Sequence, residues 1–196
     1  MAKLDLKRIL KFQELLHAFA LVERAARVRN REIHENDVEH SFTLSMLTWY
    51  AIDVFELPLN RDLAMRYALI HDLVEVYAGD TYFLDEEHRK TKDEREEKAR
   101  LRIAEEFPDF TSLNEAILTY ERQEDAESRF VKALDKVDPV LTNFAEGGRL
   151  WKEAGMQYDH LVKAKREKVA GVEEVRDLLE EIIAEIEPRK EEYFPR

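Results

Sequence analysis

Three ionisable side chains, His71, Asp72 and Glu75, stand among the apolar residues of LIHDLVEV, the first part of the stretch LIHDLVEVYAGD at residues 69–80. An unpaired charge buried among apolar residues is costly, so such a group normally has an ionic partner, a bound metal or a shifted pKa. Imidazole nitrogens and carboxylate oxygens are ligands for divalent metals. The stretch therefore predicts either metal chemistry or a buried ion pair.

The spacing of these residues suits one ion and one free carboxylate. Successive helical residues point about 100° apart, so His71 and Asp72 can reach an ion that lies between their two directions. Glu75 follows His71 by four residues and Asp72 by three, which places it on the same side of a helix. One turn cannot complete a coordination shell, so other segments must supply further ligands.

Two other segments each contain a suitable side chain. His40, in NDVEHSFTLSMLTWY, opens a run that becomes apolar, and Asp135, in FVKALDKVDPVLTNF, lies on a mostly apolar helix. Pro139 cannot donate to the carbonyl of residue 135 and crowds it. We therefore expect the helix to kink or widen near Asp135. Asp138, three residues further on, is a rival for the same role.

Each of these residues also has a purely structural explanation, and all must hold together if the metal hypothesis is wrong. The explanations are a core or helix-start histidine for His40, an ion pair with Arg66 or a neighbour for Asp72, an ion pair with Lys132 or Lys136 for Asp135, a solvated helix position for Glu75, a turn after Gly79 for Asp80, and a surface position for Arg24.

The order His, His-Asp, Asp over three helices resembles the HD-domain metal-dependent phosphohydrolases. The segments VEHS, HDLVEVYAGD and VKALD stand in the order of that family and at similar separations, which is more specific than the dipeptide alone. Within the family, the chain is most similar to the small HD-domain 5'-deoxynucleotidases, which also carry an early arginine and a Gly-Asp pair after the HDxxE segment. The resemblance covers most of residues 20–140.

This resemblance implies a role for each matched residue. VKALD selects Asp135 over Asp138 as the last metal ligand. The implied metal ligands are His40, His71, Asp72 and Asp135; the implied catalytic residue is Glu75, which would orient or deprotonate the water or protonate the leaving alkoxide; the implied substrate-binding residues are Arg24, on two phosphate oxygens, and Asp80, on a sugar hydroxyl.

Two departures from the family pattern concern the substrate. The loop between Arg24 and His40 is longer here than in the bacterial pattern, so Arg27 or Arg29 are alternatives for the phosphate contact. Ala25 stands where the bacterial enzymes have tryptophan, which leaves the substrate preference open.

The resemblance implies one divalent transition metal (Mn, Co, Ni, Fe or Zn) that activates water to remove the 5'-phosphate of (deoxy)nucleoside 5'-monophosphates. Binuclear members use extra histidines before the last aspartate, and this chain has only His88 there. The alternatives are hydrolysis of a cyclic nucleotide or nucleoside triphosphate, a di-metal carboxylate bundle, and a non-catalytic acidic helical scaffold.

We expect these residues to lie on helices. Few glycines and prolines and a period near 3.6 predict an all-α fold. The resemblance implies that it is one HD-domain bundle over residues 1–196, with a motif-bearing core at about 20–140 and C-terminal helices at 157–187 packed on it. Apolar positions recur over residues 4–28. Caps predict the further helices: 37–55 after Asn36 or Asp37, 61–78 from Asn60 to Gly79, one from Thr91 to Pro108, one from Ser112, 125–146 from Asp125, and 157–187 with a break at Gly171 and a stop at Pro188.

Composition excludes several classes of protein. The chain has no cysteine, which excludes disulfides and thiolate metal sites, and its net charge of −12 argues against a broad surface for duplex DNA. No apolar run is long enough to span a membrane, and the start lacks the apolar core of a secretory signal. We expect a cytoplasmic protein, and the resemblance implies a homodimer.

Overall fold

The computed structural model describes residues 3–79 and 90–195. Within these ranges the chain is mostly helical, with one sheet of two short antiparallel strands, so the predicted all-α fold class is confirmed. In chain order the elements are α1 (Leu6–Phe19), β1 (Glu23–Arg27), β2 (His34–Asn36), α2 (Asp37–Val54), α3 (Arg61–Ile70), α4 (Glu75–Ala78), α6 (Lys92–Glu106), α7 (Thr111–Arg122), α8 (Ala126–Ala145), α9 (Arg149–Glu153), α10 (Tyr158–Val169), α11 (Glu173–Ile186), the 3₁₀ turn η1 (Glu187–Arg189) and α12 (Lys190–Tyr193).

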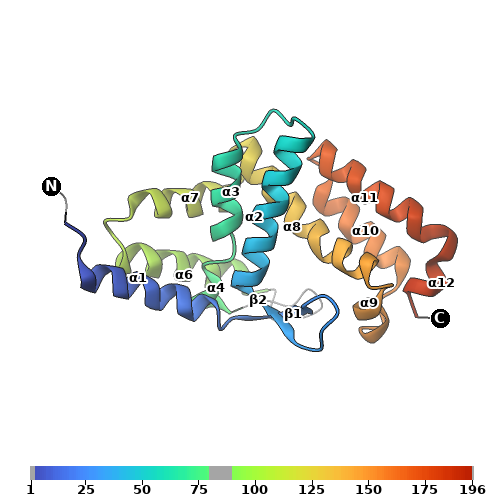
Figure 1. Cartoon of the computed structure of the whole chain (residues 1–196), viewed down its shortest axis with the longest axis horizontal. Helices are drawn as coiled ribbons and strands as arrows, with labels where there is room; N and C mark the ends of the chain where they lie inside the picture. The colour runs from blue at the N-terminus through green and yellow to red at the C-terminus, as the bar shows by residue number, and fades with distance from the viewer. Residues whose placement is uncertain (1–2, 80–89, 196) are drawn as a thin grey trace.

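Helices α2, α3 and α8 form the centre of an elongated molecule (Figure 1). On one side α1, α4, α6 and α7 enclose a smaller apolar cluster that includes Phe19, Leu73 and Ile103. On the other side α10 and α11 cover α8. The metal-ligand candidates lie on α2, directly after α3 and on α8, at the centre of the molecule.

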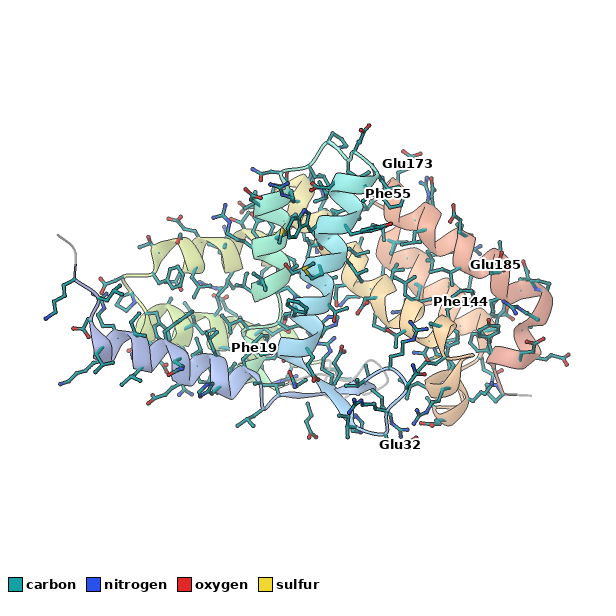
Figure 2. All side chains as sticks on the ribbon, in the orientation of Figure 1. Phe19, Glu32, Phe55, Phe144, Glu173 and Glu185 are labelled. Atoms are coloured by element: carbon teal, nitrogen blue, oxygen red, sulfur yellow. The ribbon has the colours of Figure 1, made fainter. Side chains whose placement is uncertain are left out.

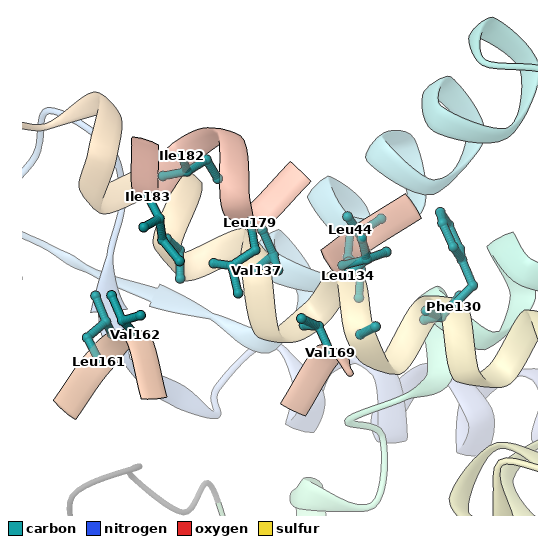
Figure 3. Close-up of a cluster of buried hydrophobic side chains, with 14 of the residues drawn as sticks. Leu44, Phe130, Leu134, Val137, Leu161, Val162, Val169, Leu179, Ile182 and Ile183 are labelled. Atoms are coloured by element: carbon teal, nitrogen blue, oxygen red, sulfur yellow. The ribbon is translucent and has the colours of Figure 1, made fainter. Parts of the chain in front are cut away.

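Helix α8 is anchored by the larger apolar cluster (Figure 3). Val137 of α8, Val169 of α10 and Leu179 of α11 are each almost fully buried there. Burying one such side chain contributes about 1.5–3 kcal/mol, so the C-terminal helices fix the position of α8. Gly148, just after α8, has φ 74°, and a Cβ there would clash with the carbonyl oxygen of Tyr193. Only glycine allows the C-terminal segment to approach this closely.

The helix starts follow the predicted caps in three places. Asn36 caps α2 in a capping box with Glu39, Asn60 accepts from the amide of Leu63, and Asp125 accepts from the amide of Ser128. Thr91 is the N-cap residue of α6, as predicted, but its side chain makes no capping hydrogen bond. The predicted cap at Ser112 is wrong, because α7 already begins at Thr111.

Two segments differ from the predicted helices. The apolar period over residues 4–28 continues past the end of α1, where Leu21 and Val22 donate to the carbonyls of Ala18 and Phe19 in a tight turn, and the strands follow. The predicted helix 61–78 is broken into α3 and α4. Leu73 and Glu75 donate to carbonyls only three residues earlier, so the backbone tightens at the His71-Asp72 pair.

The other boundaries agree with the sequence. Gly79 ends α4 with φ 74°, Gly171 separates α10 from α11, and α11 ends before Pro188. Helix α8 runs through Pro139. In the part of the chain that the structure describes, no helix has the length and apolar character needed to cross a membrane.

Candidate metal centre

Four of the residues singled out in the sequence converge from three parts of the fold. His40 lies in the first turn of α2, His71 and Asp72 in the turn between α3 and α4, and Asp135 in the middle of α8. One ligand atom from each lies within 4.8 Å of the others. The closest pairs are Nε2 of His71 with Oδ2 of Asp72, at 2.8 Å, and Nε2 of His40 with Oδ1 of Asp135, at 3.1 Å.

The His71 ring is oriented by its own helix. Its Nδ1 lies 2.8 Å from the carbonyl oxygen of Ala68, and a carbonyl only accepts, so Nδ1 carries a proton and Nε2 is the nitrogen that could bind a metal. Nε2 is buried, and although it faces Oδ2 of Asp72 at 2.8 Å, no described residue is its partner in a hydrogen bond of proper geometry. A buried polar atom with no such partner is costly, and a cation bound between the four side chains would satisfy it.

His40 is held between two aspartates. Its Nδ1 lies 3.3 Å from Oδ2 of Asp138, while Nε2 faces Asp135. Burial disfavours the charged ring, but the hydrogen bonds to Asp135 and Asp138 outweigh it and raise the pKa of His40 to about 10. A carboxylate behind a ligating histidine fixes its tautomer and orientation. Asp138, considered in the sequence only as a rival of Asp135, therefore lies behind His40.

Both carboxylates of the cluster are ionised. Burial alone would raise their pKa values, but His71 and Arg24 hold the pKa of Asp72 well below its usual range, and Lys136 and His40 do the same for Asp135. The ammonium of Lys136 lies 2.5 Å from Oδ2 of Asp135, the ion pair that the sequence offered as an alternative. Two imidazoles and two carboxylates form a nitrogen and oxygen donor set that suits a divalent transition metal.

Arg24 reaches the cluster from β1, not from the first helix. Its Nη1 lies 3.0 Å from Oδ1 of Asp37 and 2.5 Å from Oδ2 of Asp72, and its side chain is 14% exposed. The alternative arginine Arg27 pairs instead with Glu32 and Glu153. Of the two, Arg24 is the one at the cluster, and it replaces Arg66 as the expected partner of Asp72.

Glu75 begins α4 and is buried beside the cluster. An oxygen of Glu75 lies within 4.8 Å of oxygens of Asp37 and Asp72, and its Oε1 is 3.7 Å from the ammonium of Lys92. Asp37 is fully buried, although the sequence indicated it only as a helix start. Its position one residue after the Asn36 cap gave no signal of a second role. Asp80 lies outside the described residues.

Comparisons with known proteins agree with this geometry. Residues 20–176 match a family model described as the HD domain. The chain is 31% identical over 138 residues to the 5'-deoxynucleotidase HDDC2 of Bos taurus and of Homo sapiens, a match that covers 69% of this chain. It is also similar to a solved structure from Magnetospirillum magnetotacticum, named as a predicted metal-dependent phosphohydrolase: the TM-score is 0.75, the identity 26%, and both chains are covered completely.

The match with the curated relatives spans 66% of the length of the bovine and human proteins.

Proposed function

Because the chain belongs to the HD-domain family, we propose that it is a metal-dependent phosphohydrolase that removes the 5'-phosphate from (deoxy)nucleoside 5'-monophosphates. The observation that carries the proposal is the convergence of His40, His71, Asp72 and Asp135 within 4.8 Å. The relatives named 5'-deoxynucleotidase support the choice of substrate.

In this proposal His40, His71, Asp72 and Asp135 hold one divalent transition metal: Mn, Co, Ni, Fe or Zn. The buried Nε2 of His71 and the two ionised carboxylates support the assignment. A divalent ion at such a site supplies Lewis acidity, which lowers the pKa of water and polarises a phosphoryl oxygen. That help is needed because uncatalysed hydrolysis of phosphate monoesters is extremely slow.

The protein side chains perform the remaining tasks. Glu75 is the group that orients and deprotonates the attacking water or protonates the leaving alkoxide, and its burial next to Asp72 supports that role. Arg24 has its Nη1 on Asp37 and Asp72 and its Nε 3.8 Å from Oε2 of Glu35, so Nη2 is the donor that we assign to the phosphate. We assign the sugar hydroxyl to Asp80.

The test is a substrate panel after metal reconstitution. With Mn²⁺ or Co²⁺ we expect phosphate release from nucleoside 5'-monophosphates, with faster release from the deoxy series. The variant Glu75→Gln should bind the metal but turn over about 10²–10⁴-fold more slowly. Hydrolysis of cyclic nucleotides or nucleoside triphosphates alone would show that one of these, and not a nucleoside monophosphate, is the substrate. A metal-loaded protein with no hydrolysis of any phosphate ester would reject the proposal.

We also propose that the protein is a homodimer that pairs through one face of α2. Phe42, Met46, Tyr50 and Val54 recur every four residues on this helix and are 61%, 44%, 59% and 54% exposed, and Figure 2 labels Phe55 at the end of the same helix. Aromatic residues and methionine are enriched in interfaces between proteins, where charged residues are depleted. Light scattering should give a dimer, and the Tyr50→Glu variant a monomer. A monomeric wild-type protein would contradict this assignment.

A further inference from the structure

Among residues 3–79 and 90–195, three side-chain cations make ion pairs with Asp72, Glu75 or Asp135, and each comes from a different element. Arg24 of β1 contacts Asp72, Lys92 of α6 lies by Glu75, and Lys136 of α8 lies by Asp135. The substrate that we propose adds close to two negative charges at pH 7. Because the four ligands bring two carboxylates to a divalent ion, their combined charge is near zero, so the phosphate needs further counter-charges, and these three cations are candidates to supply them.

Two of the three cations are already shared between acids. Arg24 uses one nitrogen for both Asp37 and Asp72, and its Nε lies 3.8 Å from Oε2 of Glu35. Lys92 lies 3.0 Å from Glu96 and 3.7 Å from Glu75. Each therefore stabilises at least two carboxylates before any substrate binds, and has less charge to offer to a phosphate.

Lys136 differs from both. Among residues 3–79 and 90–195, Asp135 is the single carboxylate that lies within ion-pair distance of its ammonium, on the oxygen that points away from His40. An ammonium has three donors, so two are left for another anion. The Lys136 side chain is 35% exposed, against 5% for Asp135 and 1% for each histidine. It therefore links the buried cluster to the solvent side.

The backbone holds Lys136 in this place. The ammonium of Lys165, on α10, donates to the carbonyl oxygen of Lys136 at 2.6 Å, so a second helix fixes this turn of α8.

Lys92 and Lys136 lie close enough to interact electrostatically: the charge of Lys92 repels that of Lys136, and the carboxylate of Asp72 attracts both. An anion bound between two ammonium groups is attracted to both and reduces their mutual repulsion.

We propose that Lys136 is a phosphate-binding residue, whose ammonium bridges Oδ2 of Asp135 and an oxygen of the substrate phosphate. This inference rests on the proposed function and adds a contact to it. The alternative is that Lys136 only positions Asp135. The two roles predict opposite changes in metal affinity. Removing a cation beside a metal site leaves the metal affinity equal or higher, whereas losing a positioning residue lowers it about 10–100-fold.

The experiment measures the binding of inorganic phosphate, which needs no turnover. Mn²⁺ bound at the site shortens the ³¹P relaxation time of nearby phosphate, so a titration gives the phosphate Kd of the metal-loaded protein. The variants are Lys136→Gln, Lys136→Arg to restore the charge, and Lys163→Gln as the matched control, because Lys163 is exposed on α10. The Mn²⁺ affinity of each is measured separately, and phosphate is titrated at saturating Mn²⁺.

For Lys136→Gln we expect phosphate binding to weaken about 10–100-fold, as for the loss of a charge-assisted hydrogen bond, with Mn²⁺ affinity equal or higher. Lys136→Arg should recover most of the loss, and Lys163→Gln should bind as the wild type does. Unchanged phosphate binding in Lys136→Gln overturns the inference, and so does a parallel loss of Mn²⁺ affinity. A metal-loaded wild-type protein that binds no phosphate overturns the proposed function as well, which separates the two failures.

Discussion

The carboxylate of Asp138 should control how tightly the site holds its metal, although it is not one of the four ligands. It lies 3.3 Å from Nδ1 of His40 and is 6% exposed. A carboxylate in this position holds the ring so that Nε2 points at the ion. Loss of such a partner typically weakens metal binding about 10–100-fold, which corresponds to roughly 1.4–2.7 kcal/mol.

The variant that tests this is Asp138→Asn, because it keeps the volume and removes the charge. Its metal affinity is measured by competition with a chelating dye, and its free energy of unfolding by urea titration without metal. The matched control is Asp159→Asn, a change of the same kind in the first turn of α10. We expect the control to bind metal as the wild type does.

Two results would refute this reasoning. One is an unchanged metal affinity in Asp138→Asn. The other is a loss of affinity as large as that of Asp135→Asn, which would make Asp138 a ligand rather than the residue that orients His40.

Three further predictions follow from the same contacts. A divalent metal at about 100 times its Kd should stabilise the protein by about 2.7 kcal/mol, which raises Tm by roughly 5–10 °C for a chain of this size. The His71→Ala variant should show no such shift in Tm, and a full shift in that variant would exclude His71 as a ligand. Arg24→Gln removes the ion pair between Arg24 and the fully buried Asp37 and should cost about 3 kcal/mol in urea unfolding. Arg27→Gln, which breaks more exposed pairs, should cost about 1 kcal/mol or less, and equal effects of the two variants would contradict the role of burial. Burial opposes the ionised form of Asp125, but hydrogen bonds donated by Tyr67 and Ser128 lower the pKa of Asp125. The contribution of Asp125 to the free energy of unfolding is therefore present above the unfolded-state pKa, which is about 4, and is lost as the pH falls through the lower pKa of the folded state. Asp125→Ala should cost about 2 kcal/mol at pH 7 and clearly less at pH 3, and a cost that does not change with pH would show that the charge is not involved.

The sequence predicted the helical scaffold because its signals are local. Asn36, Asn60 and Asp125 cap helices through side-chain contacts two or three residues away, and such contacts can be read from spacing alone. The four ligand candidates could be identified for a different reason: ionisable residues in apolar runs need partners, and the family resemblance supplied their order.

The remaining features depend on contacts between distant segments. Residues 23–27 form a strand that pairs with β2, and from it Arg24 contacts Asp37 and Asp72, which lie 13 and 48 positions further along. The backbone tightens after Ile70 where the predicted helix was continuous. Asp138 and Lys136 both lie beside the cluster, but their spacing on α8 did not indicate in which direction each side chain points. Local propensity does not contain such information.

The most direct test of the metal centre is the metal content of the chain after reconstitution with Mn²⁺ and removal of excess ion, measured by elemental analysis for the wild type, His71→Ala and Lys163→Gln. We expect about one ion per chain in the wild type and in Lys163→Gln, and none retained in His71→Ala with its helical circular dichroism intact. Full metal content in His71→Ala, or no retained metal in the wild type, would contradict the assignment of this metal centre.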